Sequence, residues 1–230
     1  MTNLTDLKTK LATTVRLMAM EGMMDFNGHV SLRLPEGDRV LINSRFCSRV
    51  ALTAEDIVTV DLEGRLVEGN AEQPSETPLH VAIYRRRPEV GSVAHLHPRF
   101  STVFTIAGVP LKSVYIIASE FGEAGVPVFD DPRLIRKRED GEAVADALGS
   151  NSALLLRAHG AVTVANDLEG AFAVAVALEE TARTYLWASA IGTPHFLSQA
   201  EMDAYGAPVS SRNTRYKMWS FYTEKARISG

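Results

Sequence analysis

Two histidines stand two residues apart in the segment Val93-Ala94-His95-Leu96-His97-Pro98. If this segment is a β-strand, both side chains project to the same face, about 6–7 Å apart along the backbone. Two imidazole nitrogens in that arrangement can bind one metal ion. The pair alone is equally compatible with packed, hydrogen-bonded histidines, so further ligands decide between the two interpretations.

A third histidine, His159, ends the apolar run Leu154-Leu155-Leu156-Arg157-Ala158 and is followed by Gly160. Three histidines with one open position are typical of a catalytic metal site rather than a structural one. Glu76 lies upstream in Gln73-Pro74-Ser75-Glu76-Thr77-Pro78. It could serve as a fourth ligand or as the group that transfers a proton. The set of four favours a metal site.

Five short segments carry a resemblance to a known family: Gly28-His29-Val30-Ser31, Pro74-Ser75-Glu76, His80, His95-Leu96-His97 and Ala158-His159-Gly160. In order and spacing they resemble the class II aldolase/adducin-type family, which includes fuculose- and rhamnulose-phosphate aldolases and ribulose-phosphate 4-epimerase. The resemblance extends from about residue 4 to residue 190. It implies that His95, His97 and His159 bind a divalent metal, zinc first, with manganese, cobalt or iron as alternatives. It also implies that Glu76 is a resting-state ligand or an acid/base group.

The segment Asn43-Ser44-Arg45-Phe46 departs from the phosphate-using relatives, which have a Thr-Gly pair there. Pro74 replaces a serine, and the family's Gly-Asn pair is Gly28-His29 in this chain. Proline has no N–H and phenylalanine fills space, so we expect no phosphate pocket. Arg45, Phe46 and His29 would instead suit a carboxylate on a flatter, aromatic molecule. The chain therefore resembles the branch that includes dihydroxyphthalate decarboxylases.

The ligand set and the resemblance together predict a metal-dependent carbon–carbon lyase that works through a metal-stabilised enolate. The first hypothesis for its reaction is decarboxylation of a hydroxylated aromatic acid. The expected catalytic residues are Glu76, His29 and Tyr115. The expected substrate-binding residues are Asn27, Gly28, Ser31, Ser44, Arg45, Phe46, Ser75 and His80.

Three other functions remain open at this point. The first is an aldolase that cleaves a sugar phosphate or a hydroxy-keto acid. The second is a non-catalytic, adducin-like scaffold, which is disfavoured because adducin-like heads lack a full ligand set. The third is an iron-dependent oxygenase on the same scaffold, which the identity of the metal would distinguish.

Composition limits the partners of the chain. The 230 residues carry a net charge of −4 and one cysteine, Cys47. No basic patch indicates nucleic acid, and neither a basic leader nor a membrane-length apolar run is seen. We therefore expect a cytoplasmic protein without a nucleic-acid or membrane partner. The resemblance to the decarboxylase branch implies a small-molecule carboxylate as the substrate. The resemblance further implies a homotetramer with active sites at subunit interfaces.

The hydrophobic pattern predicts an α/β protein whose first third is mostly antiparallel sheet. The resemblance implies a single three-layer αβα domain over residues 1–230, with a central, mainly antiparallel sheet. We expect the aromatic tail, residues 196–230, to pack on the body or on a neighbouring subunit. The predicted helices cover residues 3–22, 77–87, 98–108, 141–148 and 168–190. The predicted strands cover residues 30–34, 39–42, 57–60, 65–67, 90–95, 114–117, 127–129, 153–157 and 161–164.

Overall fold

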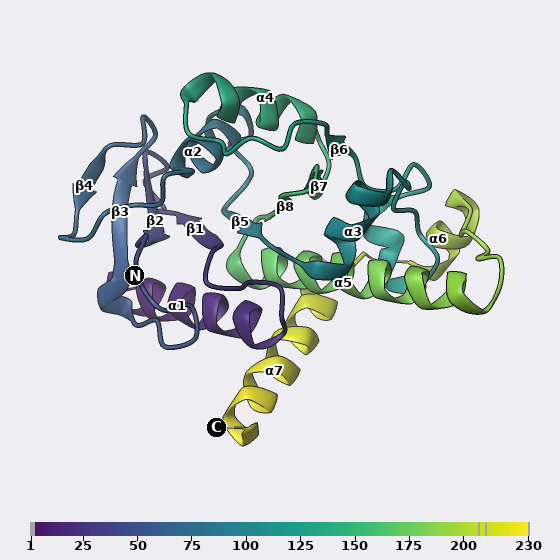
Figure 1. Ribbon diagram of the computed structural model, residues 1–230. Coiled ribbons are helices and arrows are strands. Elements are labelled where there is room, and N and C mark those ends of the chain that lie inside the picture. Colours follow the sequence, from purple (N-terminus) through teal and green to yellow (C-terminus); the bar gives the residue numbers. More distant parts are fainter. Residues whose placement is uncertain (1–2, 207, 210, 230) are drawn as a thin grey trace.

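The computed structural model describes residues 3–206, 208–209 and 211–229. They form an eight-stranded sheet in the order β4-β3-β2-β1-β5-β8-β7-β6 (Figure 1). Every neighbouring pair is antiparallel except β6 and β7, so the sheet is mixed but mainly antiparallel, as expected. The strands are β1 (His29–Arg33), β2 (Arg39–Asn43), β3 (Ile57–Asp61), β4 (Leu66–Glu68), β5 (Ser92–Leu96), β6 (Val128–Phe129), β7 (Ala153–Leu156) and β8 (Gly160–Ala165).

Helices cover both faces of the sheet (Figure 1). One face carries α2 (Thr77–Arg86) and α4 (Arg138–Leu148). The other carries α1 (Leu4–Met20), α3 (Arg99–Ala107) and α5 (Leu168–Ile191). The α/β fold class and the layered arrangement predicted from the sequence are confirmed.

Side-chain alternation along β5 divides its residues between the two layers. Ala94 and Leu96 belong to the core beneath α1 and α5, whereas Val93 belongs to the core beneath α2. His95 has the same parity as Val93 and therefore faces the α2 layer. By the same alternation on β1, the side chain of Val30 lies on the face of the sheet that α1 covers. The polar site is thus built into one specific layer of the fold.

Side chains cap the starts of two helices. The side chain of Asn3 accepts a hydrogen bond from the Thr5 amide and begins α1. Thr53 and Asp56 form a capping box around the short 3₁₀ helix η1 (Ala54–Asp56). Such caps supply partners to backbone groups that the helix itself leaves unpaired.

The strand predicted over residues 114–117 is wrong. The chain instead enters a 3₁₀ helix, η2 (Ile116–Phe121), with Tyr115 as its N-cap. The Ser113 hydroxyl donates to the carbonyls of Ala118 and Gly122 at 2.9 and 3.1 Å, which closes the loop. This local bonding gives the β-branched run an alternative to sheet pairing.

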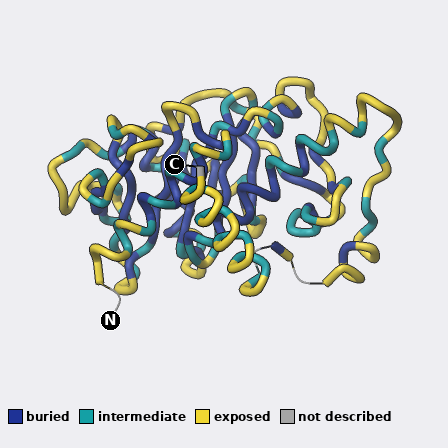
Figure 2. Tube along the Cα trace, turned by 90° about the horizontal axis from the view of Figure 1, so that it is seen from below, coloured by how far each residue is buried: buried dark blue, intermediate teal, exposed yellow. Residues whose placement is uncertain are grey.

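The C-terminal segment contains α6 (Gln199–Tyr205) and α7 (Arg212–Ser229). Trp219 and Tyr222 of α7 pack edge-on against Phe172 of α5, with ring centroids 6.0 and 5.2 Å away. Tyr216 and Phe221 stay exposed. Figure 2 shows the contrast between the buried strands and the largely exposed α7.

Among the described residues, no helix combines the length and the apolar character needed to cross a bilayer.

Candidate metal centre and active site

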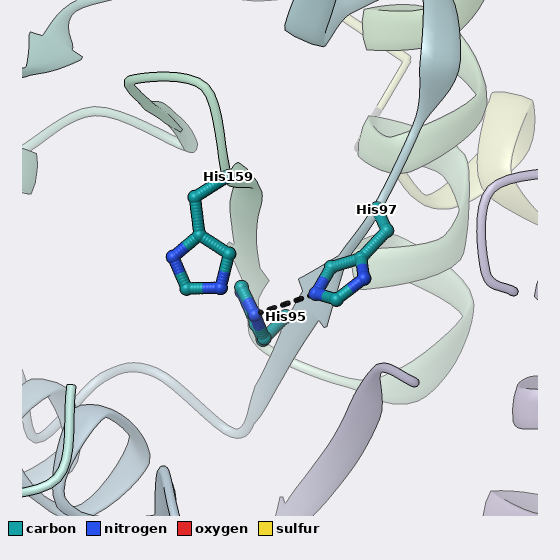
Figure 3. Close-up of side chains that lie close together, drawn as sticks. All are labelled: His95, His97 and His159. Atoms are coloured by element: carbon teal, nitrogen blue, oxygen red, sulfur yellow. Dashed lines mark hydrogen bonds between the residues drawn. The ribbon is translucent and has the colours of Figure 1, made fainter. Parts of the chain in front are cut away.

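Three histidines from two distant parts of the chain converge at the ends of neighbouring strands of the sheet (Figure 3). His95 lies on β5, His97 follows its end, and His159 lies in the turn between β7 and β8. The Nε2 atoms of His95 and His97 are 3.2 Å apart. The ring of His159 lies 4.9 Å from that of His95 and 5.5 Å from that of His97, centroid to centroid. One ring nitrogen from each histidine lies within 4.8 Å of the other two, close enough to share one ion.

The turn that carries His159 is tightly constrained. Ala158 adopts a left-handed conformation with φ of 53°, and its amide donates to the Thr105 hydroxyl at 2.9 Å. A Cβ atom at Gly160 would lie 2.1 Å from the carbonyl oxygen of Leu96, so only glycine fits there. This close approach brings the turn against β5 and places His159 beside His95.

Hydrogen bonds orient two of the three imidazoles. Nδ1 of His95 lies 3.1 Å from the Ala161 carbonyl oxygen, which can only accept, so this nitrogen carries the hydrogen. The lone pair of His95 is therefore on Nε2, which faces the cluster. Nδ1 of His97 lies 3.4 Å from the Asp25 carboxylate. Carboxylate and carbonyl partners of this kind orient histidine ligands in metal sites.

The donor set fits a divalent metal. Both ring nitrogens of His159 are buried without a hydrogen-bond partner, an arrangement that is costly unless a further group binds there. Burial lowers the pKa of His95, of His97 and of His159, so the neutral imidazole that a metal requires is favoured. Three neutral nitrogens beside a carboxylate are ligands that zinc and related ions prefer.

Glu76 lies at the N-cap of α2 and is buried. Its Oε1 accepts the amide of Ile135 at 2.9 Å, and its Oε2 lies 3.5 Å from Nε2 of His95. Burial opposes ionisation, yet the nearby His29 ring and the hydrogen bond from the Ile135 amide hold the pKa of Glu76 well below its usual value. The helix N-terminus favours the same charge state. Glu76 is therefore an ionised carboxylate beside the three imidazoles.

His29 adds a fourth imidazole to the cluster. It pairs with His95 across β1 and β5, and its Nε2 lies 3.7 Å from Oε2 of Glu76. Its Nδ1 is hydrogen-bonded to Nε2 of His80 at 2.7 Å. His29, Glu76 and His95 form a second group with metal-ligand geometry, which shares His95 with the first group.

Two residues that the sequence predicted to bind substrate are placed elsewhere. Ser31 and His80 are 0 % exposed and are hydrogen-bonded to each other beneath the site. Both side chains are therefore closed off from solvent in this structure, and their predicted role in substrate binding stays a prediction. Ser44 and Gly28 are buried as well, and Ser75 is half-buried. Gly28, with φ of 95°, lets the chain pass close to the His95 carbonyl.

The other predicted substrate residues line a neighbouring cavity of about 730 Å³ that includes Asn27, Arg45 and Phe46. Arg45 is ion-paired with Glu72 and its guanidinium lies 5.1 Å from the Phe46 ring centroid. Phe46 itself is 79 % exposed. The expected carboxylate anchor, Arg45, is therefore already neutralised within this chain.

Tyr115, predicted as a proton donor, is about half-exposed at the start of η2. Its side chain makes no hydrogen bond with the histidine cluster among the residues that the structure describes. In this chain alone the structure does not bring it to the site.

A cavity of about 460 Å³ opens directly beside His97 and has a size typical of small-ligand sites. Its lining includes Asp25, Arg99 and Phe100, none of which the sequence analysis had placed in the site. Arg99 directly follows the His-x-His-Pro segment in the sequence, and this adjacency could have indicated its position beside the site. Asp25 gave no signal, because a loop that follows α1 brings it to His97.

Comparisons with known proteins agree with this geometry. Residues 9–186 match the family model described as Class II Aldolase and Adducin N-terminal domain. The chain is 33 % identical over 194 residues to a 3,4-dihydroxyphthalate decarboxylase of Terrabacter sp. (strain DBF63), covering 79 % of this chain and 81 % of the relative. It is 29 % identical over 178 residues to a 5-deoxy-D-ribulose 1-phosphate aldolase of Bacillus thuringiensis serovar kurstaki, covering 76 % and 82 %.

A solved structure of an L-fuculose 1-phosphate aldolase superposes with a TM-score of 0.79 at 25 % identity. The match covers 87 % of this chain and 94 % of that one. The chain therefore belongs to the class II aldolase and adducin family and is, like these relatives, an enzyme.

Proposed function

We propose that this enzyme is a divalent-metal-dependent carbon–carbon lyase that decarboxylates a hydroxylated aromatic acid. The observation that carries the proposal is the convergence of His95, His97 and His159 beside the carboxylate of Glu76. Three relatives at 30–33 % identity bear the name 3,4-dihydroxyphthalate decarboxylase, which supports this substrate class.

The three imidazoles would hold the cation, and zinc suits the nitrogen-rich set best. When bound there, a divalent cation supplies positive charge to oxygen atoms of the substrate while the carbon–carbon bond breaks. Manganese, cobalt and iron are the alternatives, and metal analysis of the purified protein distinguishes them.

Glu76 is the proposed proton-transfer group. As an ionised carboxylate it accepts the proton of a phenolic hydroxyl of the substrate. The bond between the ring carbon and the carboxylate then breaks, CO2 leaves, and its electron pair stays on the ring. Glu76 returns the proton to that carbon, which balances the reaction. His29, beside Glu76, is placed to donate a hydrogen bond to the substrate.

Arg99 replaces Arg45 as the proposed anchor for a substrate carboxylate. It is exposed and lines the cavity beside His97, whereas Arg45 is paired with Glu72. A guanidinium at the cavity wall binds a carboxylate with two parallel hydrogen bonds. Arg99→Ala should raise KM for the acid by about tenfold, the equivalent of roughly 1.4 kcal/mol. Arg45→Ala serves as the matched control.

The substrate class is tested by incubating the zinc-loaded enzyme separately with 3,4-dihydroxyphthalate and with L-fuculose 1-phosphate. We expect CO2 from the aromatic acid and no aldehyde from the sugar phosphate. Aldehyde release without any CO2 would refute the decarboxylase and favour the second candidate, an aldolase. That candidate is supported by aldolase relatives at 29–32 % identity.

A homotetramer remains the proposed assembly, and a cytoplasmic location the proposed compartment. Exposed apolar side chains on the neighbouring helices α3 and α5 support contact between copies of the chain. They are Val103, Ile106, Leu186, Trp187 and Ile191. Light scattering of the purified protein measures the number of copies.

A further inference from the structure

A chain of hydrogen bonds leads away from Glu76 into the interior of the protein. Nδ1 of His29 and Nε2 of His80 are 2.7 Å apart, and Nδ1 of His80 and Oγ of Ser31 are 2.7 Å apart. The Ser31 hydroxyl is in turn 2.8 Å from the Tyr84 hydroxyl. All four side chains are at most 5 % exposed.

The chain follows from two periodicities in the sequence. His29 and Ser31 are two residues apart on β1 and face the same layer. Glu76, His80 and Tyr84 are four residues apart along α2 and lie on one face of that helix. Helix α2 packs over the sheet at this point. The polar side chains of its inner face therefore form the hydrogen bonds described above with His29 and Ser31 of β1.

The direction of the hydrogen bonds decides what His29 presents to the site. Both rings are buried, and each of the two 2.7 Å contacts of His80 holds one hydrogen between its two atoms, so the hydrogens follow one of two directions along the chain. In one direction Tyr84 donates to Ser31, Ser31 to His80, and His80 to His29. The remaining hydrogen of His29 is then on Nε2 and points toward the Glu76 carboxylate. Each of these internal bonds is 2.7–2.8 Å long.

The opposite direction is poorly supported by the geometry. The chain would have to end on the Gly91 carbonyl, 3.5 Å from the Tyr84 hydroxyl, or on the Val93 carbonyl, 3.4 Å from the Ser31 hydroxyl. Both are beyond the usual range for O–H donors. It would also leave a bare Nε2 of His29 facing the carboxylate of Glu76 at 3.7 Å. Unlike Nε2 of His95, whose lone pair binds the proposed cation, this nitrogen would then oppose the carboxylate as a second lone-pair acceptor in a buried site.

We infer that Tyr84, Ser31 and His80 hold His29 as its Nε2–H tautomer, so that His29 is a hydrogen-bond donor at the active site and not a metal ligand. Ser31, His80 and Tyr84 do not touch the cavity and are positioning residues. The inference assigns the cation to His95, His97 and His159 rather than to the group that contains His29. Its kinetic consequence rests on the proposed function, whereas its structural content does not.

The tautomer is measured directly by ¹⁵N NMR of the full chain labelled at histidine, with and without Zn²⁺. Signals are assigned by replacing single histidines. The informative variants are Ser31→Ala, which interrupts the chain, and Tyr84→Phe, which removes its terminal donor. Ser92→Ala is the matched control, because Ser92 is equally buried and donates to the Ser31 carbonyl at 2.9 Å without joining the chain.

In the wild type we expect a protonated Nε2 and an unprotonated Nδ1 for His29, unchanged by Zn²⁺. Ser31→Ala should populate the Nδ1–H tautomer, Tyr84→Phe should do so to a smaller extent, and Ser92→Ala should not. If the second tautomer reaches between half and nine-tenths of the molecules, kcat for 3,4-dihydroxyphthalate falls about 2–10-fold with KM nearly unchanged.

A zinc-coordinated or Nδ1-protonated His29 in the wild type would overturn the inference. A loss of activity in Ser31→Ala without any change of tautomer would also overturn it, because that result indicates a merely structural role. If Ser31→Ala fails to fold, Tyr84→Phe decides by the same signals. If the wild type releases no CO2, the proposed function fails while the NMR result still decides the tautomer.

Discussion

His29 and His95 are direct partners across the antiparallel strands β1 and β5, with their ring centroids 4.9 Å apart. Because cross-strand partners share one face of a sheet, this pair joins two polar groups. One is the imidazole triad, of which His97 lines the cavity, and the other is the buried hydrogen-bond chain beneath α2. Glu76 lies at their junction, within 3.7 Å of both rings.

Replacing Glu76 with glutamine should abolish proton transfer while the imidazoles remain in place. We expect kcat to fall by about 10²–10⁴-fold, the range for loss of a general acid or base. Metal content should stay near that of the wild type. Steady-state kinetics and elemental analysis check both statements, and Glu72→Gln, an exposed acid paired with Arg45, is the control. Full activity in Glu76→Gln would refute its assigned role.

Asp25 should influence metal affinity through His97. Its carboxylate faces Nδ1 of His97, and loss of such a partner typically weakens metal binding by about 10–100-fold. Competition with a chromogenic chelator measures the affinity of Asp25→Asn. Glu21→Gln is the control, because Glu21 lines the same cavity but is paired with Lys225. Equal affinities in the two variants would contradict the orienting role of Asp25.

Acid should destabilise the metal-free protein. Burial lowers the pKa of His29, His80, His95, His97 and His159 in the folded state below their ordinary value of 6.5. Below that pH the unfolded chain binds more protons than the folded one, so the free energy of unfolding falls as the pH falls. Above it, both states hold these rings neutral and the effect disappears.

Urea unfolding at a series of pH values from about 8 to about 5.5 measures this dependence. This pH range spans the ordinary pKa of histidine. His159→Gln removes one buried imidazole and should flatten the slope. A free energy of unfolding that stays constant between these limits would show that the rings are protonated equally in both states.

Gly160 should tolerate no side chain. A Cβ atom there would lie 2.1 Å from the Leu96 carbonyl oxygen and 3.1 Å from Cδ2 of His97. Gly160→Ala must separate β8 from β5, which we expect to cost about 3 kcal/mol, the upper part of the range for overpacking. Gly192→Ala, where no atom lies within 4 Å and the backbone is extended, should change stability by less than about 0.5 kcal/mol. Similar stabilities of the two variants would contradict this account.

Much of the fold follows from local patterns. Alternation on β5 predicts that His95 and His97 share a face, and the apolar run before His159 predicts its position at a strand end. The cap at Asn3 and the capping box at Thr53 depend on neighbouring residues only, so the local sequence is sufficient to specify them. The strand expected at residues 114–117 fails because the Ser113 hydroxyl closes a local loop instead.

The buried chain beneath the site could have been found in the sequence. Glu76, His80 and Tyr84 repeat every four residues, which places three polar groups on one helical face. The spacing alone does not say how deeply α2 covers the sheet, so the burial of His80 could not be predicted from it. The approach of Asp25 to His97 and the pairing of Arg45 with Glu72 depend on loop geometry, which no periodicity encodes.

The central claim is that His95, His97 and His159 bind one divalent cation together. Calorimetric titration of the metal-free protein with Zn²⁺ tests it most directly, with His95→Ala, His97→Ala and His159→Ala measured alongside. We predict one ion per chain for the wild type and a large loss of affinity in each variant, whereas His29→Asn keeps the stoichiometry. Undiminished binding in the three variants, or no binding by the wild type, would contradict the claim.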